Sequence, residues 1–118
     1  MIELAEEIML DEETLRRAAA QAAWNSGERN DMAALAESFP TLRGRPGVRP
    51  WDPARFDAWA SGPAPSSGAF HAATFVLAVY NNEAPWRSGR FNVVAAMGVW
   101  DDEHRRAFVA WARDPWTA

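Results

Sequence analysis

The run from Ala69 to Asn82, AFHAATFVLAVYNN, constrains the fold more than any other part of the sequence. It is apolar on nearly every side, and only His71 and Thr74 interrupt it before the terminal asparagines. A segment that is apolar all round is buried all round. We therefore expect this run to be the central element of a single hydrophobic core.

A helix and a buried strand are both compatible with this run, because residues 74–80 are rich in β-branched and aromatic side chains. The length of the run and its flanks favour a helix. Ser66 and Ser67 precede it as candidate caps, and the asparagines at its end tolerate the left-handed turn that closes many helices, with Pro85 just beyond. The sequence thus predicts a central helix near residues 69–82.

The remaining apolar segments have helical spacing, and none shows the alternation typical of a half-buried strand. We expect helices at residues 2–9, at residues 11–25, from Asn30 to Pro40, from Asp52, at residues 91–99 and from Asp101 to Pro115. Gly27 is expected to close the helix of residues 11–25. The predicted fold is all-α, a compact bundle of about six or seven short helices. Its length of 118 residues predicts a single domain over residues 1–118.

Helical spacing also predicts which side chains of the last two helices face the core. The expected inward residues are Phe91, Val94, Ala95, Phe108, Trp111 and Ala112. Gly98 is expected to mark either the end of its helix or a close contact with a neighbour.

Composition excludes several classes of protein. The chain has a net charge of −4 and no cysteine, so it has no disulfide framework, no thiol nucleophile and no Cys-ligated zinc. Residues 1–13 are acidic where a signal or transit peptide would be basic, and no apolar run reaches the roughly 20 residues that span a bilayer. We expect a soluble cytoplasmic protein that does not bind membranes.

Arginine is the only strongly basic residue, which a GC-rich coding sequence of bacterial type explains more simply than selection for guanidinium chemistry. Residues 41–51 form an irregular loop that carries Arg43, Arg45 and Arg49. Such a loop is expected to be solvated or paired with the acidic N-terminal helices, and phosphate binding is the alternative.

Tryptophan is unusually abundant, with seven in the chain. Those at helical or helix-boundary positions, Trp24, Trp59, Trp100 and Trp111, are expected to fill the core. Trp51, Trp86 and Trp116 instead lie in proline-flanked loops or the tail. Tryptophan beside arginine, as in residues 49–51 and 85–87, is typical of an interaction hot spot, and folding back as a lid on the core is the alternative.

No catalytic constellation stands out. Histidine is a common general base and metal ligand, and His71 and His104 with Glu103 would form a metal or general-base site if their helices adjoined. Their spacing matches no metal motif, so a hydrogen-bonded core histidine and a surface histidine are the expected outcome. We predict no catalytic residue, no metal site and no cofactor.

The sequence therefore favours a non-enzymatic accessory module that binds an unknown protein, or a second copy of itself, through a surface of tryptophan and arginine. The predicted contact residues are Arg43, Arg45, Arg49, Trp51, Trp86, Arg87 and Arg90. The alternative is a nucleic-acid-associated protein that binds phosphate through the same arginines, which the negative total charge disfavours. A histidine-based enzyme or metal protein is the third hypothesis.

Overall fold

The computed structural model describes residues 27–118, which form helices and contain no strand. The elements are a helical stretch at residues 27–37, the 3-10 turn η1 (Pro40–Leu42), α3 (Pro53–Ala60), α4 (Ser67–Asn81), α5 (Val93–Val99) and α6 (Asp102–Arg113). The all-α prediction is confirmed. The expected number of six or seven helices is slightly too high for these residues. The predicted helices at residues 2–9 and 11–25, and with them Trp24, lie outside the described residues.

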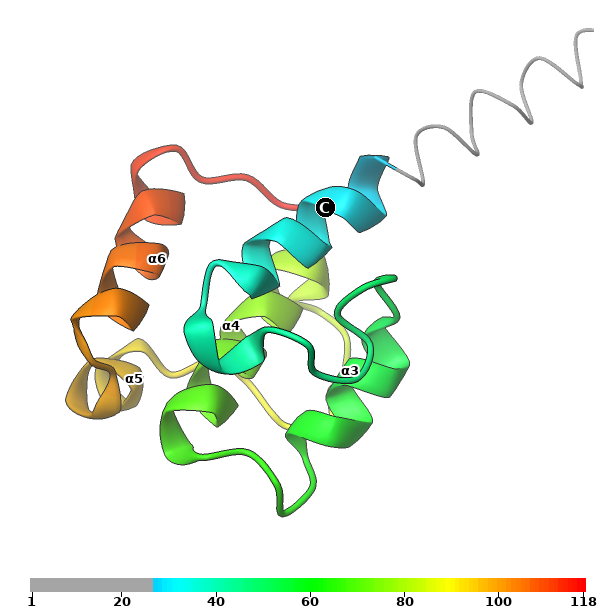
Figure 1. Ribbon diagram of the computed structural model, residues 1–118, viewed down its shortest axis with the longest axis horizontal. Coiled ribbons are helices and arrows are strands. Elements are labelled where there is room, and N and C mark those ends of the chain that lie inside the picture. The colour runs from blue at the N-terminus through cyan, green and yellow to red at the C-terminus, as the bar shows by residue number, and fades with distance from the viewer. Residues whose placement is uncertain (1–26) are drawn as a thin grey trace, which may run out of the picture.

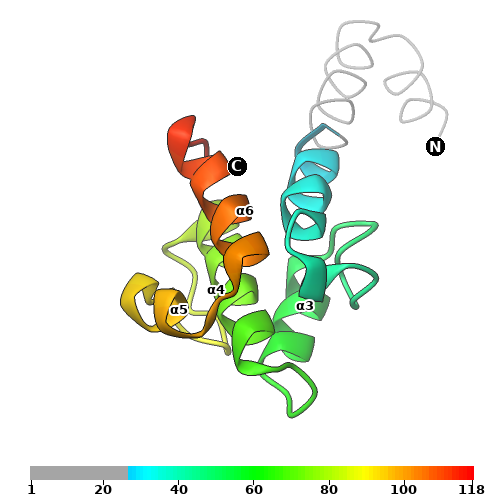
Figure 2. The ribbon, with the colours of Figure 1, turned by 60° about the vertical axis from the view of Figure 1, so that its left-hand side comes forward.

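Helix α4 lies in the middle of the other elements (Figure 1). The helix of residues 27–37 and α6 approach each other at one end and diverge toward the other (Figure 2). No helix among residues 27–118 combines the length and the apolar character needed to cross a membrane.

The central helix is confirmed, with bounds at Ser67 and Asn81. Its cap is Ser66, whose Oγ accepts the backbone N–H of Ala69 at 3.2 Å. Buried side chains follow one another along its length, from Ala69 to Val79. Its end differs from the prediction, because Asn82 has a φ of −69° and stays right-handed. The helix therefore stops without the expected left-handed turn.

Helix α3 begins as the sequence predicts. Asp52 Oδ1 accepts the backbone N–H of Arg55 at 3.2 Å, and Pro53 is the first helical residue. Loop 43–51 packs directly on this helix at Gly47, where an added Cβ would lie 2.5 Å from the backbone N of Phe56. Gly47 also has a φ of +79°, so both the space and the backbone conformation require glycine.

Two predictions about inward faces are wrong. Val94 of α5 is 79% exposed, and the fully buried residue of this helix is Ala96. The helix begins after the Asn92 cap and not at Phe91 as predicted, so a different face of it is turned inward. In α6 Ala112 is exposed, and His104 and Ala107 are buried instead. Phe108 and Trp111 are half-buried and lie beside the buried face of α6. The helix is therefore rotated about its axis relative to the prediction.

The two glycine predictions have different outcomes. Gly27 is itself helical, and the helix 11–25 that it was expected to close lies outside the described residues. Gly98 lies near the end of α5, but nothing approaches within 4 Å of the Cβ position, so it marks no close contact.

Aromatic rings attach α6 to the centre of the molecule. The ring of Phe75 on α4 lies 5.1 Å from the rings of Phe108 and Trp111 and 5.2 Å from Phe91, measured between centroids. The Trp100 indole donates to the Gly68 carbonyl at 3.0 Å, which joins the α5–α6 corner to the start of α4. Trp100 is buried and Trp59 and Trp111 are half-buried, as expected for core tryptophans.

Candidate functional site: the tryptophan and tyrosine row

The two loops with predicted contact residues converge at the C-terminal end of α4. Tyr80, in the last turn of α4, lies 5.6 Å from Trp51 and 6.2 Å from Trp86 between ring centroids. Loop 43–51 and loop 83–90 are thus neighbours in space although α3 and α4 separate them in the sequence. We call these three side chains the aromatic row.

A buried carboxylate fixes the second loop. Asp57 of α3 is 6% exposed and accepts the backbone N–H of Arg87 at 2.9 Å and that of Ser88 at 3.0 Å, together with the Ser88 hydroxyl at 2.8 Å. The Trp86 indole donates to the Asn81 carbonyl at 2.9 Å. These bonds hold Trp86 half-buried beside Tyr80, while the side chains of Arg87 and Arg90 are exposed.

Asp57 positions loop 83–90, and the sequence analysis did not single it out. The sequence feature that could have identified Asp57 is its position next to Phe56, on the face of α3 that packs inward. A buried acid at such a position needs hydrogen-bond partners.

Trp51 belongs to the core. Of the two predictions for this loop tryptophan, an interaction hot spot or a lid folded back on the core, its burial agrees with the lid. It is 5% exposed, and its ring lies 5.3 Å from that of Phe56. Its Nε1 is the one buried side-chain nitrogen or oxygen in the described part of the chain without a hydrogen-bond partner. Leaving a buried donor unpaired costs about 1–3 kcal/mol, so such a group calls for an explanation.

A cavity of about 520 Å³ adjoins the aromatic row. Its lining is Glu28, Arg29, Pro50, Trp51, Asp52, Pro53 and Tyr80. Rings form one part of this lining and charged side chains the other, an arrangement suited to a ligand with both apolar and hydrogen-bonding groups.

The arginines of loop 43–51 lie away from this cavity. Arg43 Nε donates to the Glu37 carbonyl at 2.9 Å, and Arg49 Nη2 lies 2.9 Å from Glu37 Oε1. The hydrogen bond from Arg49 lowers the pKa of the Glu37 carboxyl below its usual value. Arg45 lies over the Trp59 ring, 5.7 Å from its centroid. Loop 43–51 is therefore paired within the molecule, with the end of the helix 27–37 and with α3.

The histidines do not form the hypothesised site with Glu103. His104 is 4% exposed; its Nδ1 lies 2.7 Å from Asp101 Oδ1 and its Nε2 lies 2.7 Å from Thr41 Oγ1. His71 packs edge-on against Phe70, at 5.3 Å between centroids. Residues 27–118 contain no group of three potential metal ligands. His104 thus joins η1 to α6 as a hydrogen-bonded core histidine.

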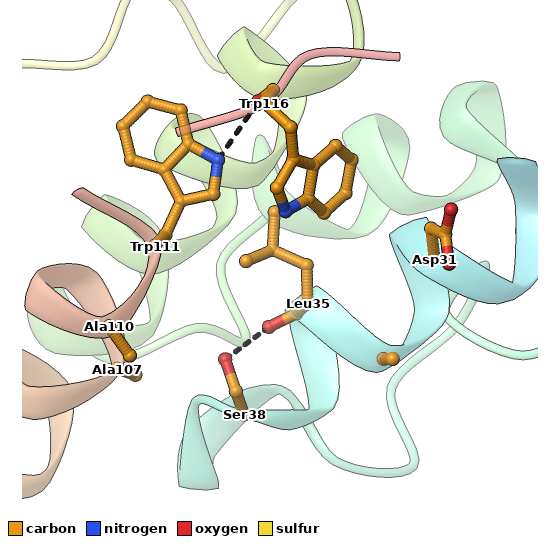
Figure 3. Close-up of a pocket in the computed structure, with 8 residues that line it drawn as sticks. Asp31, Leu35, Ser38, Ala107, Ala110, Trp111 and Trp116 are labelled. Carbon is orange, nitrogen blue, oxygen red and sulfur yellow. Dashed lines mark hydrogen bonds between the residues drawn. The ribbon is translucent and has the colours of Figure 1, made fainter. Parts of the chain in front are cut away.

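A second hollow lies between the helix of residues 27–37 and α6 (Figure 3). It measures about 480 Å³ and is lined by Asp31, Ala34, Leu35, Ser38, Ala107, Ala110, Trp111 and Trp116. The Ser38 hydroxyl donates to the Leu35 carbonyl, and the Trp111 indole donates to the Trp116 carbonyl at 2.9 Å. Both donors therefore have acceptors within the chain.

Comparison of the chain with protein-family models, curated proteins and solved structures finds no match. The function is therefore inferred from the chain's own side chains.

Proposed function

We propose that this domain is a small non-enzymatic interaction module that binds a partner protein at the aromatic row and the exposed arginines beside it. The observation that carries the proposal is the convergence of Trp51 and Trp86 on Tyr80 at 5.6 and 6.2 Å. Two loops far apart in the sequence thereby bring tryptophans to one end of α4, and the exposed Arg87 and Arg90 belong to the second of these loops; tryptophan and arginine together are the composition of an interaction hot spot.

The rigidity of this surface also supports binding. Loop 83–90 is held by three hydrogen bonds to Asp57 and one from the Trp86 indole. A surface that is already ordered loses less entropy when a partner binds, so more of the contact energy appears as affinity. Arg87 and Arg90 are exposed on the same loop as Trp86, and charge at the edge of an interface mainly sets the partner's orientation and the association rate.

A capture experiment tests the proposal. The full chain is immobilised and exposed to native lysate, as wild type and as the double variant Arg87→Glu, Arg90→Glu. The matched control is Arg106→Glu, Arg113→Glu, which makes the same charge change at exposed positions of α6. All three proteins are first shown by circular dichroism to be equally helical.

We expect a protein that is recovered by the wild type and the control and reduced at least tenfold with the Arg87, Arg90 variant. A second copy of this chain as the recovered protein would identify self-association at the same surface. Equal recovery by both variants would refute the proposal. Recovery of nucleic acid that is released steeply as salt rises would replace it with the phosphate-binding alternative.

A further inference from the structure

We propose that the groove between the helix of residues 27–37 and α6 is the docking site of the chain's own residues 11–25, which pack into it as a helix. Residues 11–25 lie outside the described part of the chain, so the inference combines their sequence with the structure of the groove. No residue that lines this groove belongs to the aromatic row, and the inference is therefore independent of the proposed function.

The groove is a wedge that opens toward the N-terminal end of the helix of residues 27–37. His104 Nε2 lies 2.7 Å from Thr41 Oγ1, and this contact joins α6 to the turn that follows the helix. Away from that contact the two helices diverge (Figure 2). A volume of about 480 Å³ between them is filled by no element of residues 27–118.

The walls of the groove are apolar, and most of their side chains are short. Ala34 and Leu35 line one wall, and Ala107 and Ala110 line the other (Figure 3). Trp116 joins the lining from the C-terminal tail and is 37% exposed, which is unusual for so large an apolar side chain. The alanines leave room for a further helix, and the larger side chains offer apolar area for it to bury.

The sequence of residues 11–25 suits this lining. At helical spacing one face of the segment consists of small apolar side chains with a single leucine, namely Leu15, Ala18, Ala19, Ala22 and Ala23. Such a face approaches a neighbour closely but buries little area of its own, so it needs larger side chains opposite. The face is uncharged, and Asp31, the one charged residue that lines the groove, is exposed, so docking leaves this carboxylate in water.

The place of the segment in the chain favours it over other occupants. The predicted helix ends near Asn25, and the helix that forms one wall already includes Gly27, at the open end of the groove (Figure 2). A short loop around Ser26 would therefore join them, which is the usual connection between antiparallel helices. A segment tethered this closely has a far higher effective concentration at the groove than a free partner.

Engineered disulfides in the full chain test this inference, because the native sequence contains no cysteine. Ala110→Cys places one thiol on the α6 wall, at an exposed position. It is combined, in separate proteins, with Ala18→Cys, Ala19→Cys or Ala22→Cys on the inward face of the segment. The matched control combines it with Ala20→Cys, which is equally near in the chain but points to another side of the predicted helix.

All four proteins are first shown by circular dichroism, under reducing conditions, to be as helical as the wild type. Oxidation in a glutathione buffer at low protein concentration is then followed by mass spectrometry. We expect at least one inward pair to form its intrachain disulfide at least tenfold faster than the control, because the bond requires Cβ atoms about 3.5–4.5 Å apart. Ala34→Cys on the opposite wall replaces Ala110→Cys if the latter alters the fold.

Three results would overturn the inference. Equal rates for the inward pairs and the control would show that the segment presents no fixed face to the groove. Preference for the inward pairs that appears only in disulfide-linked dimers would show that the segment of a second copy occupies it. Failure of every pair on both walls to form a disulfide would leave the groove to a different protein.

Discussion

At the scale of single residues, one exposed carboxylate organises the start of α6. Asp101 Oδ1 accepts the backbone N–H of His104 at 2.9 Å and lies 2.7 Å from Nδ1 of the same residue. The backbone bond first, and the ring contact second, lower the pKa of Asp101 below its ordinary value. The other ring nitrogen of His104 lies 2.7 Å from the Thr41 hydroxyl, so Asp101 helps to orient the link between η1 and α6.

This arrangement predicts a pH dependence. Because the pKa of Asp101 is lower in the folded chain than in the unfolded chain, its stabilising contribution is complete above the unfolded value of about 4 and is lost as the pH falls through the folded value. Asp101→Asn retains an oxygen for the backbone N–H but has no charge. We expect the stability difference between wild type and this variant to shrink from pH 6 to pH 2.5 in urea unfolding.

Asp102→Asn is the matched control, since Asp102 Oδ1 lies 3.9 Å from Arg105 and Asp102 does not cap the helix. Its stability difference from wild type should change less over the same range. An Asp101→Asn difference that stays constant with pH would contradict the role assigned to this carboxylate.

At the scale of elements, Gly47 determines whether loop 43–51 can pack on α3. A methyl group at this position would lie 2.5 Å from Phe56 N, 2.6 Å from Asp52 O and 2.9 Å from Phe56 Cα, all of them backbone atoms that cannot move aside cheaply. Gly47→Ala should cost more than about 2 kcal/mol of unfolding free energy, because steric overlap adds to the cost of a left-handed alanine.

Gly44→Ala isolates the conformational part of that cost. Gly44 has a similar φ of +72°, but nothing lies within 4 Å of its Cβ position, so we expect a loss of about 1–2 kcal/mol. Urea unfolding of the two variants compares them directly. Equal losses would show that loop 43–51 moves away from α3 without penalty.

Three helix starts were predictable from the sequence because capping is local, whereas the start predicted at Asn30 is wrong, since the chain is already helical at Gly27. Asp52, Ser66 and Asp101 each accept a backbone N–H three residues ahead, as their positions before helical segments indicated. The inward faces of the short final helices were not predictable to the same degree. Val94 and Ala112 recur at helical spacing, yet the face that is buried depends on rings brought from Phe75 of α4 and from Phe91.

At the scale of the whole molecule, the candidate site combines residues that no local pattern relates. The sequence singled out Trp51 and Trp86, but their common neighbour Tyr80 appeared only as part of the central helix. Asp57 anchors loop 83–90 across 30 residues of chain. Such contacts follow from tertiary packing, and the burial of Trp51 follows from the seating of loop 43–51 on α3.

The packing also divides into an α6 side and an α3 side, which meet at α4, and this division makes a last prediction. Phe75 contacts rings on the α6 side, whereas Phe56 contacts Trp51 and Trp59, at 5.3 and 6.0 Å. Both phenylalanines are buried, so each alanine substitution should cost about 3–5 kcal/mol. The two variants should differ in where protection from hydrogen exchange is lost.

Phe75→Ala should release the amides of α6 first, because Phe75 is the α4 ring against which Phe108 and Trp111 pack. Phe56→Ala should instead release loop 43–51 and α3, together with the aromatic row. Exchange measured by mass spectrometry after limited labelling assigns the loss to peptides from each side. If both variants release the same peptides equally, the domain opens as one cooperative unit and α4 does not separate two independently anchored sides.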